Sequence, residues 1–137
     1  MRSTMYFFVL LAVSTCSVAL AADAPKASET IAPLLQQSIG NVPGKTFTAV
    51  TVNFGPGVKA EPHRHGDAFV YAYVLSGSVR SQLEGQPPKV YSVGESWFEP
   101  PGAHHTMTEN ISGKVPARLL VVFIAEPGAS LKTADKP

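Results

Sequence analysis

The sequence contains little that would support disulfide, nucleic-acid or membrane chemistry. Its 137 residues include one cysteine, Cys16, so stability has to come from a packed core rather than from a disulfide within the chain. The 11 lysines and arginines stand against 10 aspartates and glutamates without any basic run, which argues against a nucleic-acid partner. After the N-terminus, no apolar run approaches the about 20 residues that a membrane-spanning helix needs.

The first 21 residues have the layout of a secretory signal peptide. A positive charge at the second residue precedes an apolar run over residues 6–13, and Ala19-Leu20-Ala21 matches the small-x-small pattern that a signal peptidase recognises. A membrane anchor and a lipoprotein lipidated at Cys16 are the alternatives. Polar residues at 14–17 interrupt the apolar run, and the residues just before Cys16 are unusual for lipidation. We expect a secreted or periplasmic protein without stable membrane insertion once residues 1–21 are removed.

The rest of the chain is typical of an all-β domain. Short segments rich in β-branched and aromatic residues alternate with turns rich in glycine and proline, and no helical segments separate them. This pattern predicts one sandwich or barrel. The expected strands are residues 46–54, 69–75, 78–83, 89–93, 96–99, 105–110 and 117–124.

Residues 46–124 are therefore the expected barrel, flanked by two less regular parts. Residues 22–45 are expected to form an irregular or helical lead-in, although residues 29–38 also allow an extended segment because Pro33 lies inside them. Residues 125–137 have no apolar periodicity and are expected to be a flexible tail. Strand 46–54 is a candidate exposed edge through which a homodimer could form.

All four histidines lie between residues 63 and 105. His63 and His65 are two residues apart, so on a strand their imidazoles point to one face. Imidazole is the usual nitrogen ligand of zinc, iron, copper and nickel in proteins. His105 follows a stretch whose glycines and proline would bend the chain and bring it opposite this pair. The neighbouring His104 would point the other way and is expected at the rim or behind a ligand.

Two motifs carry His63, His65 and His105. The first is Gly-x5-His-x-His with a later glycine, and the second is Gly-x5-Pro-x-Gly-x2-His. Their members here are Gly57, His63, His65 and Gly77, and then Gly94, Pro100, Gly102 and His105. Order and spacing resemble the two motifs of the cupin superfamily over about residues 46–124. The resemblance implies a small jelly-roll barrel that holds one divalent metal ion through His63, His65 and His105.

Two positions depart from the family pattern. Val70 stands where the first motif has a glutamate, and Asn110 falls one residue late in the second motif. Glu99, Asp67 and Glu61 are the carboxylates that could fill the gap. Glu99 is also our candidate catalytic residue, since a carboxylate near a metal can move a proton. Without a carboxylate, three neutral imidazoles would leave the charge of the ion uncompensated and favour an anionic chelating partner.

The resemblance implies several functions. The first is an O₂-dependent, non-haem Fe(II) dioxygenase that acts on a small chelating substrate; zinc, manganese, nickel or copper could also occupy the site. The alternatives are a non-catalytic cupin that binds a small molecule and a metal-holding protein of the cell envelope. The missing glutamate argues against the reactions of members that combine three histidines with a glutamate, such as manganese oxalate chemistry.

Overall fold

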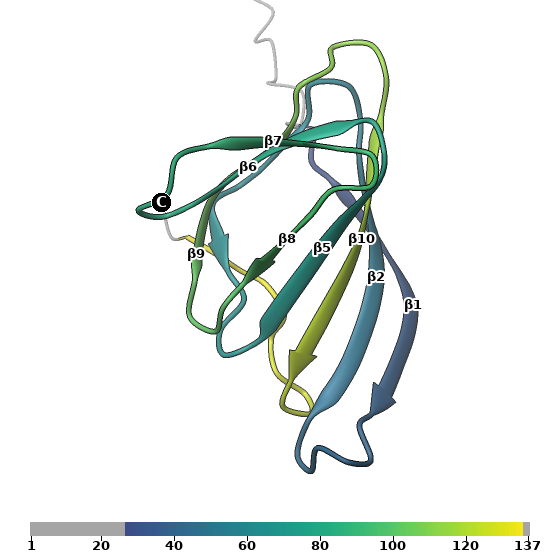
Figure 1. Cartoon of the computed structure of the whole chain (residues 1–137), viewed down its shortest axis with the longest axis vertical. Coiled ribbons are helices and arrows are strands. Elements are labelled where there is room, and N and C mark those ends of the chain that lie inside the picture. The colour runs from purple at the N-terminus through teal and green to yellow at the C-terminus, as the bar shows by residue number, and fades with distance from the viewer. Residues whose placement is uncertain (1–26, 136–137) are drawn as a thin grey trace, which may run out of the picture.

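A computed structural model describes residues 27–135, and the expected signal peptide lies outside them. Two antiparallel sheets form a barrel with the apolar core between them, as the jelly-roll expectation requires (Figure 1). One sheet has the order β1 (Thr30–Ser38), β2 (Thr46–Phe54), β10 (Ala117–Ala125), β5 (Phe69–Ser76) and β8 (Ser96–Glu99). Residues 27–135 contain no helix that is long and apolar enough to cross a membrane.

The second sheet has six strands. Five follow the order β11 (Thr133–Ala134), β4 (His63–Arg64), β9 (His104–Asn110), β6 (Ser78–Leu83) and β7 (Lys89–Ser92), and β3 (Lys59–Ala60) pairs with β9. All seven strands expected from the sequence are present, with bounds within one residue of those expected. Segments rich in β-branched and aromatic residues, bounded by glycine and proline turns, were a sufficient guide to them.

The core is built by residues two apart on the central strands of the five-stranded sheet. Val50 and Val52 on β2 pair with Val121 and Leu119 on β10, and Val121 also pairs with Ala72 on β5. All five are buried. Because successive side chains of a strand point to opposite faces, this alternation gives the barrel a continuous apolar wall.

The lead-in contains a nine-residue strand, so the irregular or helical expectation is wrong for residues 30–38 and the extended alternative is correct. β1 pairs with β2 and its register shifts between Pro33 and Leu35. Proline has no N–H to donate, and it is tolerated at such an irregularity of an edge strand. Strand 46–54 is consequently not an edge: β2 lies between β1 and β10, and β1 satisfies the backbone groups that would otherwise be exposed.

The tail differs from its expectation too. Residues 126–132 fold back, and β11 pairs with β4 so that Ala134 lies opposite His63. The backbone N–H of Asp135 donates to the carbonyl of Pro62 at 3.0 Å. Backbone hydrogen bonds hold this segment on β4. Such bonds do not depend on a pattern of apolar side chains, so the sequence did not predict that the tail docks there.

Gly77 shows why the first motif ends on a glycine. Its φ is 71°, and a Cβ at this position would lie 2.7 Å from the carbonyl oxygen of Pro116. Only glycine combines that backbone conformation with so close an approach. The turn from β5 to β6 can therefore pack against the loop that precedes β10.

Candidate metal centre

Three histidines meet inside the barrel. His63 lies on β4 and faces His105 on β9 as its direct cross-strand partner, and His65 follows β4 on the same face. Each offers one nitrogen, and these three atoms all lie within 4.8 Å of one another. The ring centroids of His63 and His65 are 4.7 Å apart, and those of His63 and His105 are 5.1 Å apart. All three residues are buried, so the cluster is an interior site.

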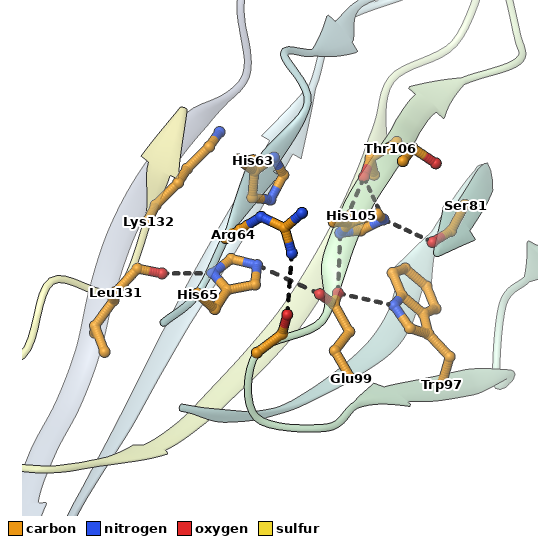
Figure 2. A network of polar contacts seen from close by, with 12 residues as sticks. His63, Arg64, His65, Ser81, Trp97, Glu99, His105, Thr106, Leu131 and Lys132 are labelled. Atoms are coloured by element: carbon orange, nitrogen blue, oxygen red, sulfur yellow. Dashed lines mark hydrogen bonds and ion pairs between the residues drawn. The ribbon is translucent and has the colours of Figure 1, made fainter. Parts of the chain in front are cut away.

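Backbone carbonyls hold two of these rings. Nδ1 of His63 donates to the carbonyl of Glu61 at 2.7 Å, and Nδ1 of His65 donates to the carbonyl of Leu131 in the tail (Figure 2). A proton on Nδ1 leaves Nε2 as the unprotonated nitrogen. Metal-binding histidines are usually oriented in this way by a hydrogen bond from their second nitrogen. The two rings are therefore held in the tautomer that a metal ion needs.

The third ring is held by hydroxyl groups. Nε2 of His105 lies 2.8 Å from Oγ of Ser81 and 2.7 Å from Oγ1 of Thr108. Nδ1 of the same ring lies 3.0 Å from Oε1 of Glu99. Ser81 lies on β6 and Thr108 on β9, and both side chains are buried. Nδ1 of His105 thus faces Glu99, and Nε2 of the same ring faces the hydroxyls of Ser81 and Thr108.

Glu99 is the carboxylate of the site (Figure 2). It is 2% exposed; Oε1 accepts a hydrogen bond from the indole of Trp97 at 3.2 Å, and Oε2 lies 3.6 Å from Nε2 of His65. That last distance is too long for a hydrogen bond. Oε2 is consequently a buried charged oxygen without a hydrogen-bond partner. Such an atom is costly unless a cation satisfies it.

The distances around Glu99 are those expected between neighbouring ligands of one ion. With metal–ligand bonds of about 2.1 Å, adjacent ligand atoms lie about 3.0 Å apart at right angles and about 3.4 Å apart in a tetrahedron. The carboxylate oxygens lie 3.0 and 3.6 Å from the nitrogens of His105 and His65. The three imidazoles therefore fit a divalent cation, and Glu99 has the spacing of a further ligand beside His65 and His105.

Glu99 also resolves the departure from the family motif. It lies on β8 directly opposite Val70 of β5, and both side chains are buried. The carboxylate is therefore carried by the cross-strand neighbour of the position where the motif has it. The other two candidates do not line the cavity beside the cluster: Asp67 lies in an exposed turn, and Glu61 is exposed and its backbone carbonyl accepts a hydrogen bond from His63.

Burial favours the neutral form of two of the three imidazoles. Burial, together with the positive charge of Lys132, lowers the pKa of His63 to about 4, although the hydrogen bond to Glu61 opposes this shift. Burial lowers the pKa of His65 as well. For Glu99, burial alone would raise the pKa, but the hydrogen bond and charge of His105 and the charge of His65 lower it overall. The neutral imidazole is the metal-binding form, so burial prepares His63 and His65 to bind an ion.

A cavity of about 140 Å³ adjoins the cluster. Most of its lining is apolar and comes from the five-stranded sheet, including Val50, Val52, Phe54, Leu119, Val121 and Phe123. The polar lining consists of the three histidines with Glu99 and Thr108, and of Glu29 and Lys132 from the two terminal segments. This volume has room for several water molecules or one small organic molecule.

Two residues at or near the second motif lie away from the cluster. His104 points to the other face, as expected, where its Nε2 lies 2.7 Å from Oδ2 of Asp135. Asn110 is buried and donates to the carbonyls of Gly55 at 3.0 Å and Val115 at 2.8 Å. Its late position in the motif therefore serves loop connections and not the cavity.

Sequence reasoning missed the residues that support the site from a distance in the chain. Ser81 and Thr108 are ordinary strand residues in the sequence and become important only because His105 lies between them. Glu29 and Lys132 lie in segments without motif or periodicity. No sequence pattern pointed to them, because their role arises from the docking of both ends of the chain on the barrel.

The comparisons agree with this geometry. The family model described as Cupin domain matches residues 50–123, which is more than half of the chain, and the chain belongs to this family. No curated protein matches it.

Several solved structures have the same fold. The protein TT1209 from Thermus thermophilus is 26% identical with a TM-score of 0.60, over 78% of this chain and 91% of that one. The DMSP lyase DddQ from Ruegeria pomeroyi DSS-3 is 24% identical with a TM-score of 0.58, over 66% and 44%. An oxalate oxidase in complex with the substrate analogue glycolate is 21% identical with a TM-score of 0.59, over 80% and 57%. This chain thus spans less than two thirds of the lyase and of the oxidase.

Proposed function

We propose that this cupin binds one divalent first-row metal ion and uses it in the O₂-dependent oxidation of a small chelating substrate, as a dioxygenase. Three histidines, His63, His65 and His105, and the carboxylate of Glu99 are the protein ligands. The observation that carries the proposal is the unpartnered, buried Oε2 of Glu99 beside three convergent imidazoles at the end of a cavity. Iron(II) is favoured for a reaction with O₂; zinc, manganese, nickel and copper also suit such donors.

The protein has a limited set of tasks in such a reaction. A bound redox-active ion would supply Lewis acidity and electron transfer between substrate and O₂. The three imidazoles and Glu99 would hold the ion, and all four residues line the cavity that would receive the substrate. Its apolar walls orient a small substrate and exclude bulk water, which strengthens every electrostatic contact within the site.

The proposed reaction needs no further reductant. A dioxygenase places both atoms of O₂ in its products, so the substrate itself provides the four electrons. We assign Glu99 to metal binding in preference to proton transfer, because both of its oxygens face imidazole nitrogens. With this carboxylate present, the argument from the missing motif glutamate against oxalate-type chemistry no longer holds. Oxalate provides only two electrons when it becomes two molecules of CO₂, so it is tested as the substrate of an oxidase that reduces O₂ to H₂O₂, and its turnover would argue against a dioxygenase.

A specific observation also supports a second function, the binding of a small molecule without turnover. The lining of the cavity is mostly apolar, with polar groups gathered at the cluster and at Glu29 and Lys132. Apolar walls with a few convergent polar groups are typical of small-molecule sites in general. In that case the ion would serve as a polar attachment point for the ligand.

One experiment separates these functions. The purified protein is analysed for bound metal, reconstituted anaerobically with Fe(II) or Mn(II), and tested for O₂ consumption with diketones, thiols, oxalate and 2-hydroxy acids. The dioxygenase predicts stoichiometric metal and substrate-dependent O₂ uptake that the His63→Ala variant lacks. Stoichiometric metal and ligand-dependent thermal shifts without O₂ uptake would favour the binding protein. A protein that retains no metal would contradict both.

Export and self-association stay proposals. Mass spectrometry of the protein recovered outside the cytoplasm should give the mass of a chain that starts at residue 22. A homodimer, tested by sedimentation, would have to form through an edge other than strand 46–54, which β1 covers.

A further inference from the structure

The two terminal segments meet at the cavity, outside residues 50–123 that the family model matches. Glu29 precedes β1, and Lys132 lies between the folded-back tail and β11. The ammonium of Lys132 forms an ion pair with Oε1 of Glu29, and both residues line the same cavity as the three histidines. The Glu29 side chain is 9% exposed and that of Lys132 is 29% exposed. This is a largely buried ion pair inside a binding cavity.

Lys132 is held beside the metal centre. The residue before it, Leu131, accepts the hydrogen bond from His65, and the residue after it begins β11, which pairs with β4. Figure 2 shows the Lys132 side chain next to His63, on the side of the cluster away from Glu99 and Trp97. The backbone of Lys132 is therefore fixed, while its long side chain can adjust within the cavity.

The charge balance of the cavity leaves room for an anion. Among residues 27–135, Lys132 is the only lysine or arginine in the lining, and Glu29 and Glu99 are the only carboxylates. A divalent ion and Lys132 together carry three positive charges, which the two carboxylates reduce to one. A lysine ammonium has three N–H donors, so a bond to Glu29 leaves donors for a second acceptor.

We propose that Lys132 is the specificity-determining residue of this site and recognises the carboxylate of a small monoanionic substrate whose remaining part is apolar. Glu29 is its counter-ion when no substrate is bound. The inference rests on the proposed function and names its substrate class. The apolar wall of the cavity receives the hydrocarbon part of the substrate, and Lys132 and the ion receive its anionic end. Neutral molecules of the same shape are bound more weakly because a charge-assisted hydrogen bond is lost.

The test compares an anion with a neutral molecule of the same shape. Butyrate and butyramide are titrated calorimetrically into the zinc-loaded protein, so that no turnover interferes, and the metal content of every sample is measured. We expect Lys132→Met to retain stoichiometric zinc and to bind butyrate about tenfold or more weakly, as expected when one hydrogen bond to a charged group is lost. Its affinity for butyramide should not change. Lys132→Arg should recover most of the affinity for butyrate.

A second variant separates recognition from support of the fold. Glu29→Gln breaks the same ion pair, but it removes the carboxylate that competes for Lys132, so butyrate should bind more tightly, by roughly threefold. An ion pair that only stabilised the fold would make both variants weaker binders. Lys45→Met is the matched control, because Lys45 lies outside the cavity and pairs with exposed Glu126 at 3.8 Å.

The outcomes distinguish this inference from the proposed function. If the wild-type protein retains no metal, the proposed function fails. If it retains metal but does not bind butyrate, or binds it as tightly after Lys132→Met, only the present inference fails. A loss of butyrate binding in both Lys132→Met and Glu29→Gln would likewise overturn it, since recognition requires opposite effects.

Discussion

The two sheets present opposite chemistry to the same interior. From the five-stranded sheet, β2 and β10 direct valine, leucine and phenylalanine inward, whereas β4, β6 and β9 of the other sheet bury histidine, serine and threonine. An apolar wall is stable wherever water is excluded. The polar wall needs a partner for each buried group, and it has one for nearly every atom.

Glu99 carries one of three buried side-chain atoms without a hydrogen-bond partner in residues 27–135; the other two belong to Thr51 and His104. Glu99 lies at the edge of the apolar sheet, on β8, and crosses the interior to the histidines of the other sheet. Its Oε2 has no hydrogen-bond partner. A barrel with one apolar and one polar wall therefore creates a binding site at the boundary of the two walls, where an unsatisfied charge and a cavity coincide.

Removing a ligand from the polar wall should have the largest effect. His63→Ala and His105→Ala should each abolish stoichiometric metal binding, because both residues supply a nitrogen to one compact cluster. His104→Ala is the matched control and should retain the ion, since its ring points toward Asp135. Elemental analysis of the three proteins provides the measurement. Equal metal loss in the His104 variant would place the site on the other face of β9.

Moving the carboxylate from Glu99 on β8 to position 70 on β5 tests whether the site needs a carboxylate where the two walls meet. Glu99→Gln should weaken divalent metal binding by about 10- to 100-fold or more, because a charged donor is lost. The double variant Val70→Glu/Glu99→Gln should recover much of that affinity, since the two residues are cross-strand partners. Competition with a chromophoric chelator measures both. Unchanged affinity in Glu99→Gln would show that the carboxylate serves only His105 and Trp97.

Acid should lower the free energy of unfolding through the buried histidines of the polar wall, since the apolar wall has no such titrating groups. The pKa of His63 is about 4 in the folded protein against an ordinary value of 6.5, so the unfolded chain binds more protons between these values. The free energy of unfolding of the metal-free protein should therefore fall as the pH drops from about 6.5 to about 4, by up to about 3 kcal/mol. The lowered pKa of Glu99 acts in the same direction at lower pH.

Urea titrations of the metal-free protein at several pH values provide the measurement. The matched variant is His63→Gln, which cannot titrate and should show a shallower dependence on pH. A slope as steep as that of the wild-type protein would assign the acid sensitivity to other groups.

Truncation within the apolar core should have the smallest effect on the site. Val74 is fully buried on β5 and is absent from the cavity lining, so Val74→Ala should lower the free energy of unfolding by about 1 to 3 kcal/mol. Metal content should stay stoichiometric, which chemical denaturation and elemental analysis together can check. Loss of the ion in this variant would mean that metal binding by the polar wall depends on the packing of the apolar wall.

Much of the fold followed from local patterns. Segments rich in β-branched and aromatic residues between glycine and proline turns predicted every long strand of the barrel between residues 46 and 125, and the two motifs that carry His63, His65 and His105 predicted the convergence of these histidines. The edge strand at 30–38 and the docked tail could not be predicted in this way. Their side chains are mostly exposed, and the hydrogen bonds that hold them belong to the backbone, which every sequence has.

The sequence by itself determined the class of domain and the identity of three imidazole donors, because both depend on periodicity and on spacing along the chain. Only the tertiary structure decided which carboxylate lies beside them, since Glu99 faces Val70 through the pairing of β5 with β8 and not through any separation in sequence. It also brought Glu29 and Lys132, at opposite ends of the described chain, into one cavity. Contacts of that kind depend on how strands are ordered in space, which local chemistry does not encode.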